Sequence, residues 1–457
     1  MVYRTWTNHP TGENKTELMK ILPYKLSTTK DLLTSRSGLV TVAHLMNKVG
    51  FSDLVDKHFP DPKSNRGFKP SVFVNSLMLM LQEGGACLDD LRHIRQDRAL
   101  RKLLGLKQVP QSDSLGNWLR RIGLEGVKAV TQINKPILKC ALHDCKSVTL
   151  DIDATLSASK NKNAQWTYKK CKGYMPMVGH IAETGQVLAT DFRDGNISPA
   201  TENFEFIKRC EAALPKGVQV KKLRIDAAGY QTNIIDDCIS RNIQFAIRAK
   251  MNQSLKKMIA GIEETQWQPL LNTNETEVVD ESTCRIVHSM NASQYAFTVV
   301  VQRRKIEGQL SLDIETEESH ELMVHNAYVY RAIATNRSEL TNSALVHWYN
   351  QRAEDSENRI KELKLDFGAN RMPCGNFAAN ALYFSLCSLA YNLFALLRLL
   401  MPVRFERCRA KTIRWRLYAL AGKVVTHGRE IFLKVQSTSR YLIEEVLNSI
   451  VQLAQAP

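Results

Sequence analysis

The sequence has no Cys-x-x-Cys pair, although it contains ten cysteines. This absence excludes the usual zinc ribbons, zinc fingers and dithiol redox motifs, because these need closely spaced cysteine pairs. The segment "CALHDC", Cys140 to Cys145, places His143 between two cysteines, but its spacing matches no usual finger or knuckle. The cysteines are spread through predicted strands and helices, which is typical of small core residues in a reducing compartment.

Long apolar runs are also scarce. The N-terminal segment "MVYRTWTNHPTGENKTE" has no apolar stretch, so no signal peptide is predicted. One segment, Phe377 to Met401, is long enough to span a bilayer. Asn380, Asn392 and Arg398 interrupt it and basic residues follow it at once, so we interpret it as a buried core helix. These features predict a cytoplasmic protein without a membrane partner.

Acidic residues are few relative to basic ones. The 457 residues include 46 Asp and Glu against 62 Lys and Arg, which gives a formal net charge of +16 and a pI of about 9.3. A chain of this length is expected to form roughly two to four domains. The basic excess favours a polyanionic partner, and charge alone leaves both nucleic acid and an anionic membrane open.

The hydrophobic periodicity divides the chain into five regions. Residues 1–140 are predicted to be helical and basic, which fits a DNA-binding or dimerisation region as well as a plain helical bundle. Residues 141–250 alternate strands with helices, which predicts a mixed sheet covered by helices. Residues 251–335 form a β-rich insert whose last strand, "YVYRAIATN", is expected to rejoin that sheet. Residues 336–400 are predicted to be long helices, and residues 401–457 a basic helical region.

Two predicted strands carry aspartates where they end. In "LDIDATL" side chains alternate between the two faces of the strand, so Asp151 and Asp153 share one face. The segment "LRIDAAGYQ" repeats the pattern with Asp226. Neighbouring strands lie about 4.8 Å apart, so Asp153 and Asp226 on adjacent strands would reach one divalent cation, which prefers oxygen ligands. Each motif alone also fits an aspartate that caps the following helix or turn.

A third acidic stretch, "YNQRAEDSENRIKELK", runs from Tyr349 to Lys364 in a predicted long helix. With the two aspartate motifs, and with "GNISPATENFEFI" and "RWRLYALAGKVVTHGRE", it resembles DDE-type insertion-sequence transposases. The resemblance is to the bacterial group with a tyrosine–arginine–glutamate–lysine signature, and it extends from about residue 150 to about residue 430. It implies an α/β RNase H-like catalytic core, interrupted by a β-rich insert and flanked by helical N-terminal and C-terminal regions.

The resemblance implies a role for each matching residue. The three catalytic, metal-binding carboxylates fall on Asp153, Asp226 and Glu357. The signature residues that would hold phosphates are Tyr349, Arg352 and Lys364. Some relatives hold a flipped base on a tryptophan, for which Trp267 is a candidate, although core packing is the more common role for such a residue. The basic C-terminal segment adds three expected DNA-binding residues: Arg409, Arg414 and Arg416.

The spacing departs from the family pattern after Arg352. The family usually leaves three residues between this arginine and the glutamate, whereas here four intervene, "AEDS". At about 100° per residue, a regular helix would place Arg352 and Glu357 about 140° apart instead of about 40°. We therefore predict a helix irregularity, such as a π-bulge, between Ala353 and Ser356. A rival pairing, Glu354 with Lys361, keeps the seven-residue spacing but puts Glu354 only two residues after the arginine.

The resemblance also implies the reaction and the partners. The protein would bind the ends of its insertion sequence, cleave phosphodiester bonds and transfer the 3′-hydroxyl ends to target DNA, using two Mg²⁺ or Mn²⁺ ions. The expected partners are double-stranded DNA, as inverted-repeat ends and target, and a second copy of the chain in a homodimer on DNA. The expected location is the bacterial cytoplasm, with the nucleoid. Two alternatives stay open: an RNase H-like nuclease without strand transfer, and a non-catalytic DNA-binding protein derived from a transposase.

Overall fold

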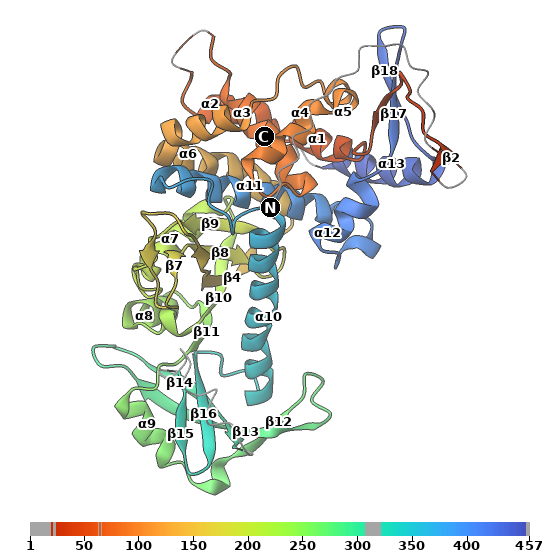
Figure 1. Cartoon of the computed structure of the whole chain (residues 1–457). Helices are drawn as coiled ribbons and strands as arrows, with labels where there is room; N and C mark the ends of the chain where they lie inside the picture. Colours follow the sequence, from red (N-terminus) through yellow and green to blue (C-terminus); the bar gives the residue numbers. More distant parts are fainter. Residues whose placement is uncertain (1–19, 22–23, 63, 65, 307–320, 454–457) are drawn as a thin grey trace.

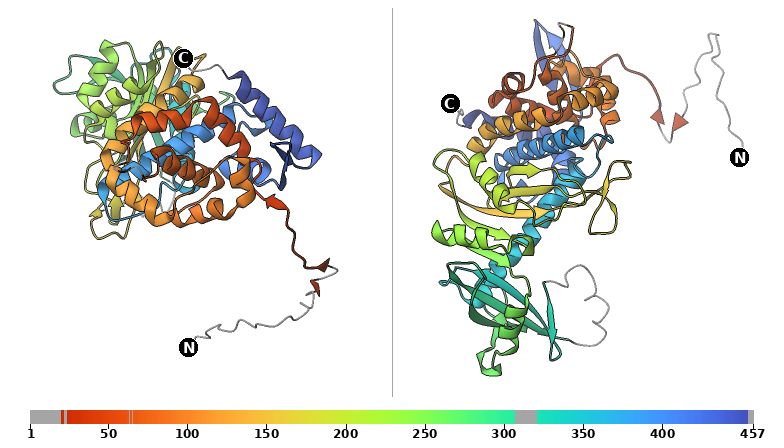
Figure 2. Two further views of the ribbon diagram at one scale, coloured as in Figure 1. Left: turned by 90° about the horizontal axis from the view of Figure 1, so that it is seen from above. Right: turned by 90° about the vertical axis from the view of Figure 1, so that its left-hand side faces the viewer.

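The computed structural model describes residues 20–21, 24–62, 64, 66–306 and 321–453. Figures 1 and 2 show three tiers: a helical region, a central sheet with its helices, and a β-rich end. Helix α10 (Asn342–Asp366) runs alongside the sheet and connects the β-rich end to the helical region (Figure 1). The segment that carries the third acidic stretch therefore lies against the middle of the molecule.

The helical tier is built around one apolar helix, α11 (Phe377–Leu399), which packs against α6 and α3. Every residue from Ala379 to Leu397 is buried, which confirms the interpretation as a core helix. This helix is long and apolar enough to cross a membrane by length and composition, but 89% of its most apolar window is buried inside the protein. The surrounding N-terminal helices are α1 (Leu39–Lys48), α2 (Phe51–His58), α3 (Pro70–Glu83), η1 (Leu88–Asp90), α4 (Leu91–Gln96), α5 (Arg98–Leu103) and α6 (Ser112–Ala141).

The central sheet has ten strands, in the order β12-β13-β14-β16-β11-β10-β4-β8-β9, with β15 paired to β16. Strand β10 is parallel to both β4 and β11, whereas β8 and β9 continue the sheet in antiparallel fashion. The strands of the first part are β4 (Ser147–Ala154), β8 (Met177–Ile181), β9 (Val187–Asp191), β10 (Gln219–Ile225) and β11 (Gln244–Arg248). A small side sheet follows β4 and consists of β5 (Ser157–Ala158), β6 (Gln165–Trp166) and β7 (Lys172–Tyr174).

The β-rich segment extends the same sheet. Its last strand, β16, pairs with β11 in antiparallel fashion, which confirms that this strand rejoins the main sheet. The segment contains α9 (Gln253–Ala260), η3 (Glu264–Gln266), β12 (Gln268–Leu271), β13 (Val278–Ser289), β14 (Ala296–Lys305), β15 (Met323–His325) and β16 (Tyr328–Thr335).

The two faces of the central strands have different neighbours. Leu150 and Ile152 of β4, like Leu223 and Ile225 of β10, pack in one apolar cluster with α7 (Asn203–Ala213) and α8 (Thr232–Ser240). Because side chains alternate along a strand, the charged positions between these residues point to the other face, where α10 lies. The apolar face therefore stabilises the strands, while the polar face is available for chemistry.

The C-terminal region was predicted to be helical, and it also contains a β-hairpin that was not predicted. After η4 (Val403–Phe405), α12 (Ala410–Ile413) and a π-helical turn η5 (Arg414–Tyr418), the chain forms a hairpin of β17 (Gly422–His427) and β18 (Glu430–Lys434). The turn uses Gly428 at φ +57°, and β17 pairs with the N-terminal strand β3 (Leu32–Thr34). Helix α13 (Ser437–Gln452) follows, and β1 (Lys20–Ile21) pairs with β2 (Tyr24–Lys25). The alternating pattern around "THGRE" indicates such a hairpin, and the composition-based prediction missed it.

Candidate active site

The two aspartate motifs lie on adjacent parallel strands. Leu223, Arg224 and Ile225 of β10 pair in register with Leu150, Asp151 and Ile152 of β4. The next residues along the two strands are Asp226 and Asp153, so both carboxylates lie at the carboxyl ends of neighbouring strands. This arrangement confirms the predicted proximity of the two strands.

Below these carboxylates, a buried ion pair joins the same two strands. The Nε and Nη2 atoms of Arg224 each donate a hydrogen bond of 2.7 Å to the carboxylate of Asp151, and both side chains are at most 2% exposed. The third nitrogen of Arg224 donates to the carbonyl oxygen of Trp348 in α10, also at 2.7 Å. The pair therefore connects the sheet to α10. Sequence reasoning missed it, although opposite charges occupy the same position in "LDID" and "LRID".

The environment of Asp153 disfavours its ionised form. Burial raises the pKa of Asp153 to about 6; the charge of Asp226 adds to the increase, whereas Arg352 opposes it. The side chain of Asp153 is nevertheless 29% exposed, so an ion or a substrate has access to it. Asp226 accepts a hydrogen bond from the backbone N–H of Ala228 at 3.0 Å and so caps the short helix η2 (Ala227–Gly229). Asp226 thus caps the following helix, as one interpretation of its motif predicted, and it also lies beside Asp153.

Helix α10 places two basic side chains at the end of β4. Nη1 of Arg352 donates to the carbonyl oxygen of Ile152 at 3.2 Å and lies 4.0 Å from Oδ1 of Asp153. Although burial opposes its charge, nearby Tyr349 and three aspartates raise the pKa of Arg352 above its usual value. Three helical turns further on, Nζ of Lys364 donates to Oγ1 of Thr155 at 3.1 Å and to the Leu156 carbonyl at 2.6 Å. Both cations thus border the candidate site.

Tyr349, the first of the predicted signature residues, is buried. Its ring lies beside two guanidinium groups, 4.9 Å from that of Arg248 and 5.7 Å from that of Arg352. The buried ring of Tyr349 therefore packs beside the guanidinium of Arg352.

The predicted helix irregularity was wrong. Helix α10 is α-helical at every residue from Asn342 to Asp366, and among the described residues the π-helical turn is η5 instead. Regular helical geometry puts Ser356, about 40° from Arg352, on the buried face and leaves Glu357 exposed. Glu357 shares its side of the helix with Lys364, seven residues further on. The side chain of Glu354, the rival candidate, lies outside the described residues.

The structure therefore brings two of the three predicted carboxylates together. Among the described side chains, no group of three or more His, Cys, Asp or Glu residues is arranged to hold a metal ion. Asp153 and Asp226 meet at the strand ends, and Glu357 lies on the helix that covers them.

Comparison with known families decides the relationship of the chain. The family model described as "Transposase DDE domain group 1" matches residues 23–455, which is nearly the whole chain. The chain belongs to this DDE transposase family. The three acidic segments of the transposase thus lie within the matched region.

Comparison with individual proteins adds less. No match was found among curated proteins. Among solved structures, the transposase is similar to the piggyBac transposase in a synaptic complex with hairpin DNA, determined by cryo-electron microscopy. The identity is 11%, the match covers 91% of this chain and 80% of that chain, and the TM-score is 0.42.

The remaining predicted DNA-binding residues occupy different environments. Trp267 is half-buried, with its ring 4.1 Å from the Arg303 guanidinium and 5.9 Å from the ring of Tyr330, so it packs within the β-rich segment. The guanidinium of Arg414 donates to the carbonyl oxygens of Leu81 and Gln82, which gives this residue a packing role. Two residues expose their side chains, as a DNA contact requires: Arg409 and Arg416.

Sequence reasoning overlooked a basic ribbon beside the site, residues 157–174, which contains β5, β6 and β7. No acidic residue occurs between Asp153 and Glu183. The ribbon exposes two aromatic rings, Trp166 (63%) and Tyr168 (49%). It also exposes five lysines: Lys160, Lys162, Lys169, Lys170 and Lys172. The alternation of lysines with aromatic residues was the available signal, since both side-chain types are typical of single-strand nucleic-acid contacts.

The ribbon is held next to the carboxylates. Asn161 donates through Nδ2 to the carbonyl oxygen of Cys374 at 2.6 Å, and Ser157 donates to that of Ala369 at 3.2 Å. The charge of Lys169 acts on both Asp153 and Lys364. The ribbon thus forms one border of the candidate active site.

Proposed function

We propose that this DDE transposase binds the ends of its insertion sequence, cleaves phosphodiester bonds there and transfers the 3′-hydroxyl ends to target DNA. One observation carries the proposal: Asp153 and Asp226 lie together at the ends of adjacent parallel strands, bordered by Arg352 and Lys364 of α10. In a chain of the DDE transposase family, these carboxylates are the natural first two members of the acidic triad.

The two carboxylates fit a divalent cation. Asp226 raises the pKa of Asp153, which means that the two negative charges repel each other at close range. A hard cation would relieve this repulsion, because Mg²⁺ and Mn²⁺ prefer carboxylate oxygens. We assign Asp153, Asp226 and Glu357 as the residues that would hold two such ions. When bound, the ions supply Lewis-acid polarisation of the phosphate and neutralise its developing charge.

The chain's own cations would position the DNA. The ammonium of Lys364 has one donor beyond its two hydrogen bonds, and it lies at the end of β4, beside the carboxylates. Arg352 holds the strand end of β4 through Ile152 and offsets the charge of Asp153. The ribbon at residues 157–174 would bind the strand that leaves the site, with its lysines on phosphates and its exposed aromatic rings on bases.

A cleavage and joining assay tests the function. The DNA would be the short inverted repeats that flank the gene, supplied as a labelled duplex with Mg²⁺ and a circular plasmid. We expect cleavage at the element ends and covalent joining of the cut ends to the plasmid. Cleavage without joining would support a nuclease, and binding without cleavage would support a non-catalytic DNA-binding protein.

The third carboxylate is tested separately by exchanging glutamates on the same helix. We expect Glu357→Gln to lower Mg²⁺-dependent cleavage on the order of 100-fold or more, because even residues that only support metal ligands cost 10- to 100-fold when lost. Glu354→Gln is the matched control, with the same chemical change three residues away. A loss confined to Glu354→Gln would move the third carboxylate to Glu354.

A further inference from the structure

A second basic surface lies near the beginnings of β4 and β10, at the ends of these strands opposite to the carboxylates. Two adjoining hollows, with volumes of about 1120 and 480 Å³, share Lys135, Ala212 and Ala213 in their walls. Together they form a groove between α6, the end of α7 and the turn that precedes β10. We call this the basic groove and define it by its lysines: Lys48, Lys57, Lys128, Lys135, Lys139 and Lys216.

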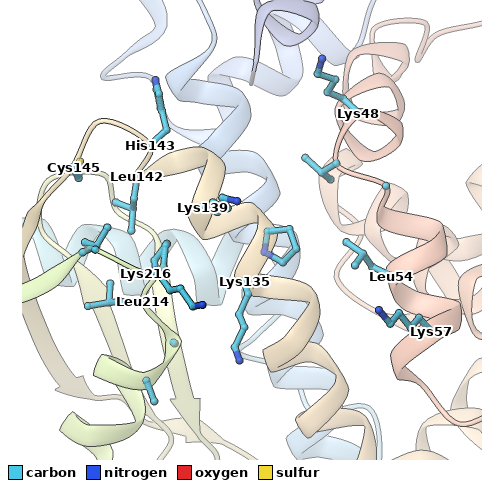
Figure 3. Close-up of a pocket in the computed structure, with 18 of the residues that line it drawn as sticks. Lys48, Leu54, Lys57, Lys135, Lys139, Leu142, His143, Cys145, Leu214 and Lys216 are labelled. Atoms are coloured by element: carbon cyan, nitrogen blue, oxygen red, sulfur yellow. The ribbon is translucent and has the colours of Figure 1, made fainter. Parts of the chain in front are cut away.

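Segments far apart in the sequence supply these lysines, and Figure 3 labels all of them except Lys128. Lys48 and Lys57 come from the first two helices, and Lys216 comes from the turn after α7. Figure 3 shows Lys135 and Lys216 reaching into the space between α6 and this turn, with Lys57 projecting toward α6 from the other wall. The charges of Lys57 and Lys135 both act on His58, which agrees with a short separation.

Helix α6 carries a stripe of like charges along the groove. Lys128, Lys135 and Lys139 are separated by seven and four residues, so they lie within about 40° of one another on the helix surface. Like charges at this spacing repel each other and destabilise a helix slightly. If these lysines served only the stability of the fold, acidic residues between them would stabilise the helix, and the stripe contains none.

The lysines of the groove have few partners in the protein. Among the described residues, no hydrogen bond or ion pair involves Lys57, Lys128, Lys135, Lys139 or Lys216, while Lys48 donates to the carbonyl oxygen of Val451 at 2.9 Å. Asp53 is the one acidic residue in the walls of the two hollows. The groove therefore presents uncompensated positive charge on a concave surface, which concentrates anions.

The dimensions of the groove fit a nucleic-acid backbone. The residues of α6 that line it run from Val127 to Lys139, which is about 18 Å at 1.5 Å per residue. Measured along the axis of a duplex, this length corresponds to about five phosphates of one strand, at 3.4 Å per phosphate. The larger hollow, which Cys145 and Val218 line, lies near the beginnings of β4 and β10, roughly 23 Å from the carboxylates at their ends, which is about seven base pairs along a duplex axis.

We propose that the basic groove binds the phosphate backbone of a DNA duplex at a position separate from the active site. This inference rests on the proposed function, because it assumes that the transposase acts on DNA. The inference goes beyond the proposed function because it assigns a second contact to the same duplex. This contact would lie within about one turn of the DNA helix from the site of cleavage. The groove would hold the duplex in register while the carboxylates act on one phosphate.

The salt dependence of binding tests the inference. We expect Lys135→Gln/Lys139→Gln/Lys216→Gln in the full chain to reduce the slope of log K against log[salt] by up to about 2.7, since each neutralised phosphate contact contributes about 0.9. The matched control removes three positive charges that are already paired with acids: Arg404→Gln/Lys423→Gln/Arg440→Gln. The slope of the control should stay at the wild-type value. Equal slopes for the two triple variants would overturn the inference.

The length of the duplex provides the second arm. As a 40-base-pair end duplex is shortened stepwise, the slope of the wild-type protein should fall once the DNA no longer reaches the groove, whereas the triple variant should show no such step. On the shortest duplex that is still cleaved, the two proteins should cleave equally. A wild-type protein that does not bind DNA would refute the proposed function itself, whereas binding and cleavage with unchanged slopes would refute only the groove.

Discussion

Asp153→Asn is expected to abolish Mg²⁺-dependent cleavage of the element ends, with a loss on the order of 10³-fold or more, while leaving DNA binding intact. The substitution keeps the shape of the side chain but removes the negative charge that a divalent cation requires. Cleavage would be measured on a labelled end duplex, and binding on the same duplex in EDTA. Retained cleavage would refute the assignment of this site.

The same variant also has an expected effect on stability. The pKa of Asp153 in the folded protein is raised to about 6, above its usual value. The ionised carboxylate therefore lowers the free energy of unfolding, and this loss is complete once the pH is above about 6. A neutral asparagine removes this cost. In EDTA at pH 8, Asp153→Asn should therefore unfold at the same temperature as the wild type or at a higher one. Addition of Mg²⁺ should raise the unfolding temperature of the wild type only, because only the wild type binds the ion there.

Asp194→Asn is a suitable control for both measurements. Burial also raises the pKa of Asp194, but this residue belongs to neither aspartate motif. The control should keep its cleavage rate and its response to Mg²⁺. If it lost cleavage as completely as Asp153→Asn, the loss would no longer locate the active site.

Asp151→Ala is expected to destabilise the transposase by about 3–5 kcal/mol, because it leaves the buried guanidinium of Arg224 without its partner. Urea unfolding, followed by circular dichroism and tryptophan fluorescence, would measure the change in the free energy of unfolding. Cleavage should fall as well, since Arg224 also holds α10 through the carbonyl oxygen of Trp348.

A double replacement separates loss of a charge pair from loss of packing. Asp151→Leu/Arg224→Met should recover most of the stability, because replacing both partners of a buried ion pair by apolar residues is often neutral. Arg440→Ala, which removes an exposed pair with Glu444, should leave the unfolding curve unchanged. An Asp151→Ala variant that unfolds at the wild-type urea concentration would show that the pair does not hold α10 in place.

Local patterns predicted the strands and the two aspartates that end them. The segments "LDID" and "LRID" each end with a carboxylate. The two segments have the same length, which agrees with the residue-by-residue register that the structure shows. The apolar segment Phe377–Leu399, with the polar residues that interrupt it, likewise predicted a buried helix. These features depend on residues within one or two turns of each other, so periodicity reveals them.

Contacts between distant segments escaped prediction. The hairpin of β17 and β18 completes its sheet with Leu32–Thr34, nearly 400 residues earlier in the chain, and no local pattern encodes that pairing. The basic groove gathers lysines from three separate segments. The register of α10 was predicted from family spacing, but the regular helix and its packing place Ser356 on the buried face instead.

The sequence by itself determined the residue types from which the site of this transposase is predicted: two strand-end aspartates, a helix with the predicted signature residues and an excess of positive charge. These depend on residue type and short-range spacing, which the chain carries before it folds. Only the tertiary structure decided which carboxylates meet, which arginines are used in packing, and where uncompensated lysines gather. Those outcomes depend on how the sheet and α10 pack together, because burial and neighbouring charges set the energy of every ionised group.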